Sequence, residues 1–239
     1  MKQIYSRDNP LVRNLRRLAE SARERKKSGH TLLDGLNLIR AYEAVQGPVD
    51  TLVVSEAGLQ DAEISAFLAG RDAVLLAPGL FRELSAVESP SGILALGAIP
   101  LPGPAADPAA DCVLLDGIQD PGNLGTLLRT AAAAGIGQVL LSRECVAAWS
   151  PKVLRAGQGA HFVLAIHEGV DLAAFLKGFR GTSAVTTLEA AQSLYAVPLM
   201  SPLAWVFGSE GRGVSAPVAA AAALRIRIPM PGPIESLNV

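Results

Sequence analysis

The chain has 239 residues, of which 50% are hydrophobic, 18% are charged and 5% are aromatic. This length suits one large domain or two ordinary ones, and the composition is that of a globular protein with few aromatic platforms for stacking single-stranded bases. No apolar run approaches the roughly 18–20 residues of a membrane span and no signal-peptide pattern follows Met1, so we expect a cytoplasmic protein without a membrane partner.

The spacing of cysteines and histidines argues against a metal or redox site. Cys112 and Cys145 form no CxxC pair, and the three histidines have no metal-ligand spacing. Two buried thiols in a reducing compartment are the favoured interpretation, and we expect no metal. No histidine lies near a GxSxG element, so a serine-hydrolase site is not predicted.

The net charge of −1 conceals a basic N-terminal segment. Residues 1–30 carry nine basic and three acidic side chains, a net charge of +6, which leaves −7 for the rest of the chain. Such a segment suggests contact with a polyanion, and the alternative is an ordinary solvated helix face. The candidate contacts are Arg7, Arg13, Arg16, Arg17, Arg23, Arg25, Lys26 and Lys27.

Predicted helices and strands alternate along residues 1–99, as in a small α/β domain. Asn9-Pro10 is typical of a capped helix start, and leucines at helical spacing extend the predicted helix to residue 27. Further predicted strands are His30–Leu33, Thr51–Val54, Val74–Leu76 and Ile93–Leu96, with helices over Leu36–Val45 and about Leu59–Leu68. Residues 100–110 are rich in proline, glycine and alanine, so we assign them to a linker.

Residues 111–239 form a second predicted domain. The sequence Asp120-Pro121-Gly122-Asn123 is typical of a turn, and Asn123 is the predicted cap of the helix that follows. A strand at Cys112–Leu115, this helix through Ala134 and a strand at Val139–Leu141 make a βαβ unit, which should cross over right-handed. Later strands are predicted at Phe162–Ile166, Ser183–Thr186, Ala204–Phe207 and Leu224–Ile228, with helices between them.

The last two predicted strands both run into loops rich in glycine, proline and small polar residues. Such loops present backbone groups to a ligand at the carboxyl edge of an α/β sheet. The first loop, GSEGRG, carries Glu210, and the second, IPMPGPIESLNV, carries Ser236 and Asn238. The GxxGxG spacing differs from the GxGxxG of dinucleotide folds, which disfavours a nicotinamide-dependent oxidoreductase.

A third group of candidate site residues, besides those of the two loops, lies on the predicted helix that starts near Asn123. Arg129 stands about two turns further along, and amides at a helix start together with an arginine suit a phosphate group. The alternative is an asparagine cap and an unrelated surface arginine.

Three strings in this order, NLGTLLRTAAAAG, VFGSEGRGVS and IPMPGPIESLNV, resemble motifs 1, 2 and 3 of the SpoU (TrmH-type) RNA 2′-O-ribose methyltransferases of the SPOUT class. SPKVLRAGQGAHF, at Ser150–Phe162, is similar to the family as well, and the resemblance covers residues 111–239. The first domain is more loosely similar to the L30e-like substrate-binding domain of many members, through SRDNPLVRNLRRL and GHTLLDGLNLIRAYEAV. Asp34 stands where a glutamate is more usual.

This resemblance implies an α/β fold in which an L30e-like RNA-binding domain precedes a SPOUT methyltransferase domain with a parallel sheet between helices and a deep C-terminal trefoil knot. It further implies S-adenosyl-L-methionine as the cofactor and a homodimer. The implied cofactor contacts are Thr187, Leu188, Gly208, Ile228, Met230 and Leu237. The residues that match the family's polar catalytic set are Asn123, Arg129, Glu210, Ser236 and Asn238.

The implied reaction is methyl transfer to a ribose 2′-hydroxyl in structured RNA, with 23S rRNA favoured over tRNA because of the L30e-like domain. Since an arginine stays protonated, we expect Arg129 to clamp a phosphate or to act with that phosphate to take the proton. The alternatives are a tRNA 2′-O-methyltransferase and a non-catalytic RNA-binding or ribosome-assembly factor on the same fold.

Two departures from the family pattern stand out. Ala133 replaces an acidic residue of motif 1, for which we expect an effect on packing only. Family members also continue beyond SLNV into a helix that completes the knot and packs in the dimer, so we expect this final helix to be missing from residues 111–239.

Overall fold

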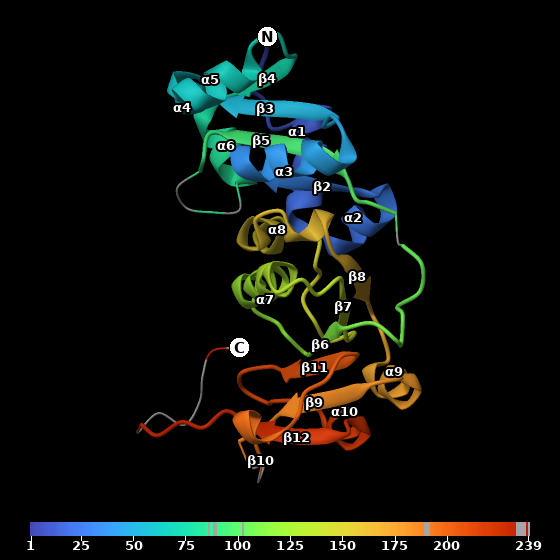
Figure 1. The fold of residues 1–239 in the computed structure, drawn as a ribbon. Coiled ribbons are helices and arrows are strands. Elements are labelled where there is room, and N and C mark those ends of the chain that lie inside the picture. Colours follow the sequence, from blue (N-terminus) through green and yellow to red (C-terminus); the bar gives the residue numbers. More distant parts are fainter. Residues whose placement is uncertain (86, 88–89, 102, 189–191, 233–237, 239) are drawn as a thin grey trace. The chain divides into compact units, whose positions relative to one another are not determined.

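The structure is a computed structural model that describes residues 1–85, 87, 90–101, 103–188, 192–232 and 238 (Figure 1). The chain divides into two compact units, each built on its own sheet. The first comprises Met1–Leu101 and Trp149–Phe162, and the second Pro102–Ala148 and Val163–Val239. Among the residues that the structure describes, no helix combines the length and the apolar surface needed to cross a bilayer.

The first unit contains a mixed five-stranded sheet. Its strands, in spatial order, are β1 (Lys2–Ile4), β4 (Ala73–Leu76), β3 (Thr51–Ser55), β5 (Ile93–Ala98) and β2 (His30–Asp34). β1, β4 and β3 are parallel, whereas β5 is antiparallel to both of its neighbours. The four strands predicted in this unit are therefore confirmed. The three-residue β1 is too short to show a pattern in the sequence.

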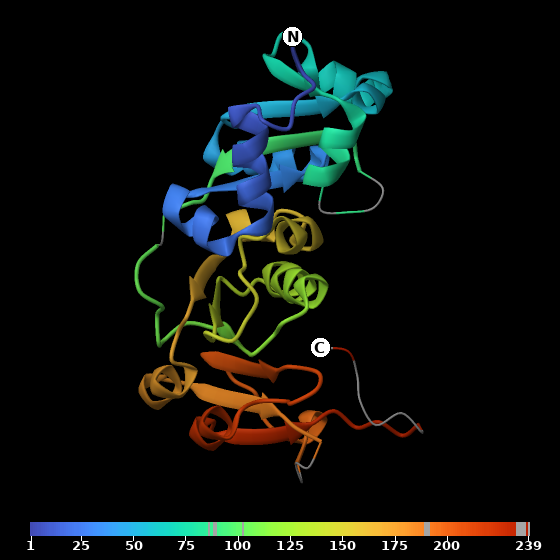
Figure 2. The same ribbon diagram turned by 180° about the vertical axis from the view of Figure 1, so that it is seen from behind.

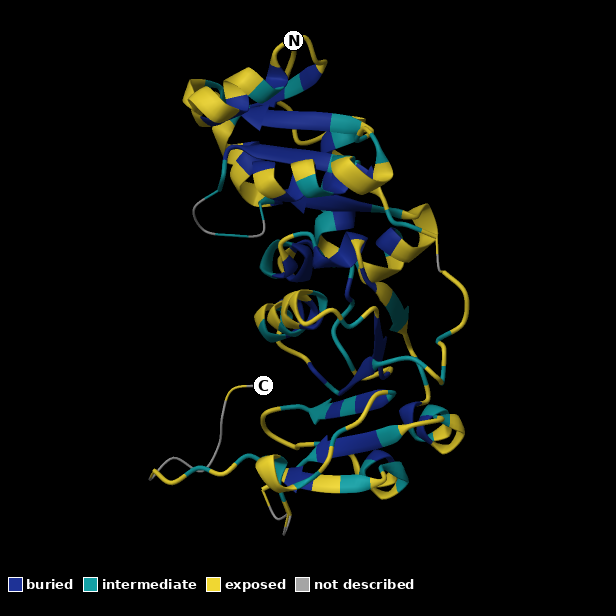
Figure 3. Cartoon of the chain, in the orientation of Figure 1, coloured by how far each residue is buried: buried dark blue, intermediate teal, exposed yellow. Residues whose placement is uncertain are grey.

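Helices cover both faces of this sheet because successive residues of its strands point to opposite sides. One face packs against α1 (Pro10–Glu20) and α6 (Pro78–Leu84), and the other against α3 (Leu36–Gln46) and α5 (Ala62–Leu68). The remaining helices of this unit are α2 (Ala22–Ser28), α4 (Glu56–Gln60) and α8 (Pro151–Gly157). The strands are buried between helices whose outer faces are exposed (Figure 3).

The predicted helix over residues 9–27 is broken at Ser21. Asn9 caps α1 as predicted, but Ser21 is extended and its hydroxyl accepts a hydrogen bond from the Glu24 amide, which starts α2. Arg25 is 5% exposed, and its guanidinium donates to the Leu18 carbonyl at 2.7 Å. Carbonyls at the end of a helix lack intrahelical donors, and Arg25 supplies one. Its assignment as an RNA contact is thereby corrected, since the side chain is used inside the unit.

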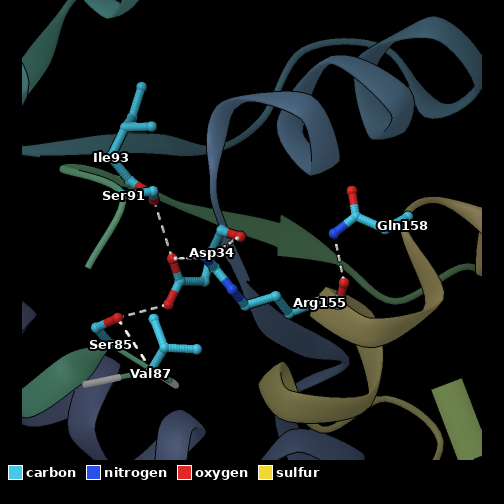
Figure 4. A network of polar contacts seen from close by, with 7 residues as sticks. All are labelled: Asp34, Ser85, Val87, Ser91, Ile93, Arg155 and Gln158. Carbon is cyan, nitrogen blue, oxygen red and sulfur yellow. Dashed lines mark hydrogen bonds and ion pairs between the residues drawn. The ribbon is translucent and has the colours of Figure 1, made fainter. Parts of the chain in front are cut away.

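A buried carboxylate at the end of β2 binds α8 within the first unit. Asp34 ends β2, and its side chain is 1% exposed. Its oxygens accept hydrogen bonds from Arg155 at 2.9 Å, Ser91 at 3.1 Å and Ser85 at 2.7 Å (Figure 4). A buried charge is tolerated only with such donors. The network therefore fastens α8 and both ends of the α6–β5 connection to the end of β2.

The second unit contains a seven-stranded sheet in which all the described pairs are parallel. Its strands, in spatial order, are β10 (Gln192–Ser193), β12 (Leu224–Arg227), β9 (Thr182–Thr186), β11 (Leu203–Gly208), β6 (Cys112–Asp116), β7 (Gln138–Leu141) and β8 (Ala165–Glu168). The helices are α7 (Pro121–Ala133), α9 (Leu172–Gly178) and α10 (Ala216–Ala221). Figure 2 gives the reverse view of both units. The predicted parallel α/β sheet is confirmed.

Two local predictions in this unit are wrong. β8 begins at Ala165, three residues after the predicted start, because Ala160–Phe162 form a 3₁₀ turn that belongs to the first unit. The cap of α7 is Asp120, whose carboxylate accepts a hydrogen bond from the Asn123 amide at 2.8 Å. Since Asp120 caps the helix, the Asn123 side chain can make other contacts.

Replacing Arg155 with alanine should destabilise the first unit, because a buried carboxylate then loses its cationic donor. We expect the free energy of unfolding to fall by about 2 kcal/mol. The measurement is urea unfolding followed by Trp149 fluorescence in a Trp205→Phe background. Arg40→Ala, which breaks the exposed pair with Glu63, is the control and should cost less than about 1 kcal/mol. Equal effects of the two variants would contradict the role given to the Asp34 network.

Candidate functional site

The carboxyl ends of four neighbouring strands meet at one edge of the seven-stranded sheet. The parallel register aligns the end of β6 with that of β11, so that Asp116 pairs with Gly208. β9 lies between β11 and β12, and its end is in register with theirs. The strand order reverses between β6 and β11, since β7 and β8 lie on one side of β6 and the later strands on the other. Ligands of open α/β sheets bind outside such a reversal point.

A cavity of about 700 Å³ lies against the ends of β9, β11 and β12. This volume is within the usual range of small-molecule sites. Five of the six predicted cofactor contacts line it, and Leu237 lies outside the described residues. The five are Thr187, Leu188, Gly208, Ile228 and Met230. Further lining residues that the sequence analysis did not single out include Leu127, Phe207, Arg212 and Arg225.

The loop after β11 is closed tightly on itself. Ser209 and Gly213 form an antiparallel bridge, and the Gly213 amide donates to the Ser209 carbonyl at 2.8 Å. A Cβ atom on Gly208 would lie 2.0 Å from the Gly213 carbonyl carbon. Only glycine fits at position 208 without moving this loop.

A second cavity, of about 620 Å³, shares the loop residues 209–213 with the first. Its wall combines residues 116–120 after β6, Asn123 and Ser215 with the loop residues 209–213 and Glu144. It thus opens where the strand order reverses. This cavity was not predicted, although the turn DGIQDPGN directly after a buried strand was a signal for it.

Three predicted catalytic residues meet where the two cavities adjoin. The Asn123 side-chain amide donates to the Glu210 carboxylate, and Asn238 donates to the Asn123 side-chain oxygen at 3.1 Å. Asn238 lines the first cavity, Asn123 lines the second and Glu210 lines both. Ser236 lies outside the described residues.

The structure does not bring Arg129 to this junction. Arg129 is exposed on α7 and is not among the described residues that line either cavity. Arg212, in contrast, lines both cavities from the loop after β11. Arg212 belongs to the GSEGRG string, whose place directly after a predicted strand was a signal for its role in a cavity wall.

The predicted basic contacts of the first unit fall into three groups. Arg7 and Arg16 both pair with Glu83, and Arg25 is buried. The others are exposed on α1 and α2, namely Arg13, Arg17, Arg23, Lys26 and Lys27. A row of exposed cations on two consecutive helices suits a polyanion.

Burial shifts the pKa of both thiols and of one histidine. Burial and the neighbouring Asp111 raise the pKa of Cys112 to about 12, and burial raises the pKa of Cys145. Burial lowers the pKa of His167. Among the described residues, no group of three or more histidine, cysteine, aspartate or glutamate side chains could hold a metal ion.

Both parts of the chain match models of known protein families. Residues 111–239 match the model of the SpoU rRNA Methylase family, and residues 9–95 match the MRM3-like substrate binding domain. The chain is 34% identical over 246 residues to an uncharacterized tRNA/rRNA methyltransferase of Synechocystis, with 99% of this chain and 88% of the relative covered. It is 30% identical over 242 residues to the 23S rRNA (guanosine(2553)-2′-O)-methyltransferase RlmP of Bacillus subtilis, with 100% and 95% covered.

The fold of the chain is also similar to solved structures of RNA methyltransferases. The fold matches that of an RNA 2′-O ribose methyltransferase with a TM-score of 0.84 and 30% identity, covering 99% of this chain and 93% of the other. It also matches an AdoMet-bound rRNA methyltransferase from Sinorhizobium meliloti with a TM-score of 0.79 and 25% identity, covering 99% and 92%.

The two thiols should be unreactive in the folded protein. Only a minute fraction of Cys112 is thiolate at pH 8 when its pKa is about 12, and the residue is fully buried. We expect a thiol reagent to modify Cys112 only after unfolding, and Cys145 much more slowly than a free cysteine. The measurement is a timed reaction at pH 8, with urea-unfolded protein as the control for both thiols. Rapid reaction of Cys112 in the folded chain would show that β6 is not buried as described.

Proposed function

The chain belongs to the SpoU rRNA methylase family, and we propose on this premise that it transfers a methyl group from S-adenosyl-L-methionine to a ribose 2′-oxygen of structured RNA, in 23S rRNA. The observation that carries the proposal is the meeting of Asn123, Glu210 and Asn238 between two adjoining cavities. A transfer reaction needs a donor site and an acceptor site in contact, and two adjoining cavities support such a pair of sites.

We place the methyl donor in the first cavity. Leu188, Ile228 and Met230 give it apolar lining suited to a flat aromatic ring, while Thr186 and Thr187 at the end of β9 and residues 208–213 after β11 line the rest. Pockets of this kind, mostly apolar with a few polar groups, are typical of cofactor sites. When bound, S-adenosylmethionine supplies an electrophilic methyl group on a sulfonium. The residues that would hold it are the five predicted contacts that line the cavity.

The acceptor hydroxyl would be held at the junction by Glu210 and Asn123. An ionised carboxylate has about four acceptor positions, so Glu210 can accept a hydrogen bond from a ribose hydroxyl as well as from Asn123. Asn238 orients Asn123 through its own hydrogen bond. A ribose hydroxyl is a weak nucleophile, and fixing it in line with the methyl group accounts for much of the expected rate.

RNA contacts outside the cavities are assigned to arginines and lysines. Arg129, exposed on α7, would clamp a phosphate of an RNA strand that leaves the second cavity. The exposed cations of α1 and α2 would bind the RNA more remotely, in the unit that matches a substrate-binding domain. The proposal also includes a homodimer and a C-terminal trefoil knot, which rest on the family resemblance.

Methyl transfer to RNA tests the proposal directly. The full chain with labelled S-adenosylmethionine and an unmodified 23S rRNA transcript should yield a 2′-O-methylated nucleotide. Arg129→Ala should reduce kcat/KM for RNA by about 10-fold or more while RNA binding falls only modestly. Arg82→Ala, an exposed arginine on α6, is the matched control. RNA binding without any methylated product would favour a non-catalytic assembly factor instead.

Gly208→Ala should weaken binding of the cofactor product. The new methyl group would meet the Gly213 carbonyl carbon at 2.0 Å, so the loop after β11 must move. We expect the affinity for S-adenosylhomocysteine to fall by at least about 10-fold, since the cavity wall is displaced. Calorimetry measures this effect, and Gly137→Ala, where an added Cβ has no neighbour within 4 Å, is the control. Unchanged affinity in Gly208→Ala would place the cofactor elsewhere.

A further inference from the structure

The second cavity shares the wall 209–213 with the proposed cofactor cavity. We propose that it receives the base of the target nucleotide, and that Glu144 makes the enzyme select guanine. This inference rests on the proposed function, which supplies the ribose at the junction. It adds the residue that reads the base.

The place of the cavity in the sheet supports a ligand site. It lies outside the carboxyl ends of β6 and β11, the two strands between which the strand order reverses. Loops after such strands diverge to opposite faces of the sheet and leave a crevice between them. The first cavity lies beside β9, β11 and β12, so the reversal point itself belongs to the second cavity.

The chemistry of the acceptor places its base in the same cavity. The carbon that bears the 2′-hydroxyl is bonded to the carbon that bears the base, so the base cannot lie far from the reacting oxygen. The methyl donor fills the first cavity, and Asn123 and Glu210 hold the hydroxyl at the junction. The second cavity is the concave space on the acceptor side of that junction.

Four carboxylates line the second cavity, and three of them are already engaged. Asp116 accepts from the Ser215 amide at 2.8 Å, Asp120 caps α7, and Glu210 accepts from Asn123. Glu144 is exposed in the cavity wall, and none of the hydrogen bonds and ion pairs among the described residues involves its carboxylate. Its two oxygens are therefore the acceptors that a ligand meets.

Guanine is the base that matches a carboxylate. Its N1–H and N2–H₂ groups stand side by side and can donate to both oxygens at once, whereas adenine and cytosine pair one amino donor with an adjacent acceptor nitrogen. Uracil places its single N–H between two carbonyls, which a carboxylate repels. Gln119 also lines the cavity and carries an amide donor suited to the guanine O6. A good bidentate contact to a base discriminates by at least about 5-fold.

The test begins with the full chain, labelled S-adenosylmethionine and an unmodified 23S rRNA transcript, followed by digestion and separation of the four 2′-O-methylnucleosides. The label should appear in 2′-O-methylguanosine. The mapped guanosine is then replaced by inosine, which keeps N1–H but lacks the 2-amino group. We expect kcat/KM to fall by at least about 5-fold with the native chain.

Glu144→Gln should lower kcat/KM for the guanosine RNA by a similar factor and remove the difference between guanosine and inosine. Its affinity for S-adenosylhomocysteine should not change, and Glu56→Gln, an exposed carboxylate of the first unit, is the control for both measurements.

Three results would overturn the inference. These are methyl transfer to another nucleoside, an unchanged preference for guanosine in Glu144→Gln, and a loss of S-adenosylhomocysteine affinity in that variant, which would place Glu144 at the methyl donor. Absence of any methylated nucleoside would instead contradict the proposed function itself.

Discussion

The parallel pairing of β11 with β6 is the constraint on which the rest of the second unit depends. It joins the part of the sheet made of β6, β7 and β8 to the part made of β11, β9, β12 and β10. It also brings Gly208 level with Asp116. Without this pairing the loops that follow the two strands would not face each other. Both cavities, and the wall that they share, are consequences of this one register.

The shared wall is held by contacts that leave little freedom. Gly208 lies so close to Gly213 that no side chain fits, and the bridge between Ser209 and Gly213 closes the loop. Asn123 reaches this wall from α7 because Asp120 caps that helix in its place. A loop fixed in this way can present Glu210 to two ligands at once, which suits a transfer between them.

Features that depend on local sequence were predictable, and those that depend on strand order were not. Apolar runs located β6, β9, β11 and β12, and the loops after β11 and β12 pointed to Glu210 and Asn238. The second cavity needed the knowledge that β11 lies beside β6, which no local pattern contains. Arg25 was misassigned for a different reason, since a basic residue on a helix gives no sign that the end of the preceding helix will bury it.

Backbone hydrogen exchange with and without saturating S-adenosylhomocysteine tests the central claim most directly. We expect slower exchange in the loops after β9, β11 and β12, around Thr187, Gly208–Gly213 and Ile228, with α1 unchanged. Protection confined to the first unit, or unchanged exchange in all three loops when calorimetry shows binding, would contradict it.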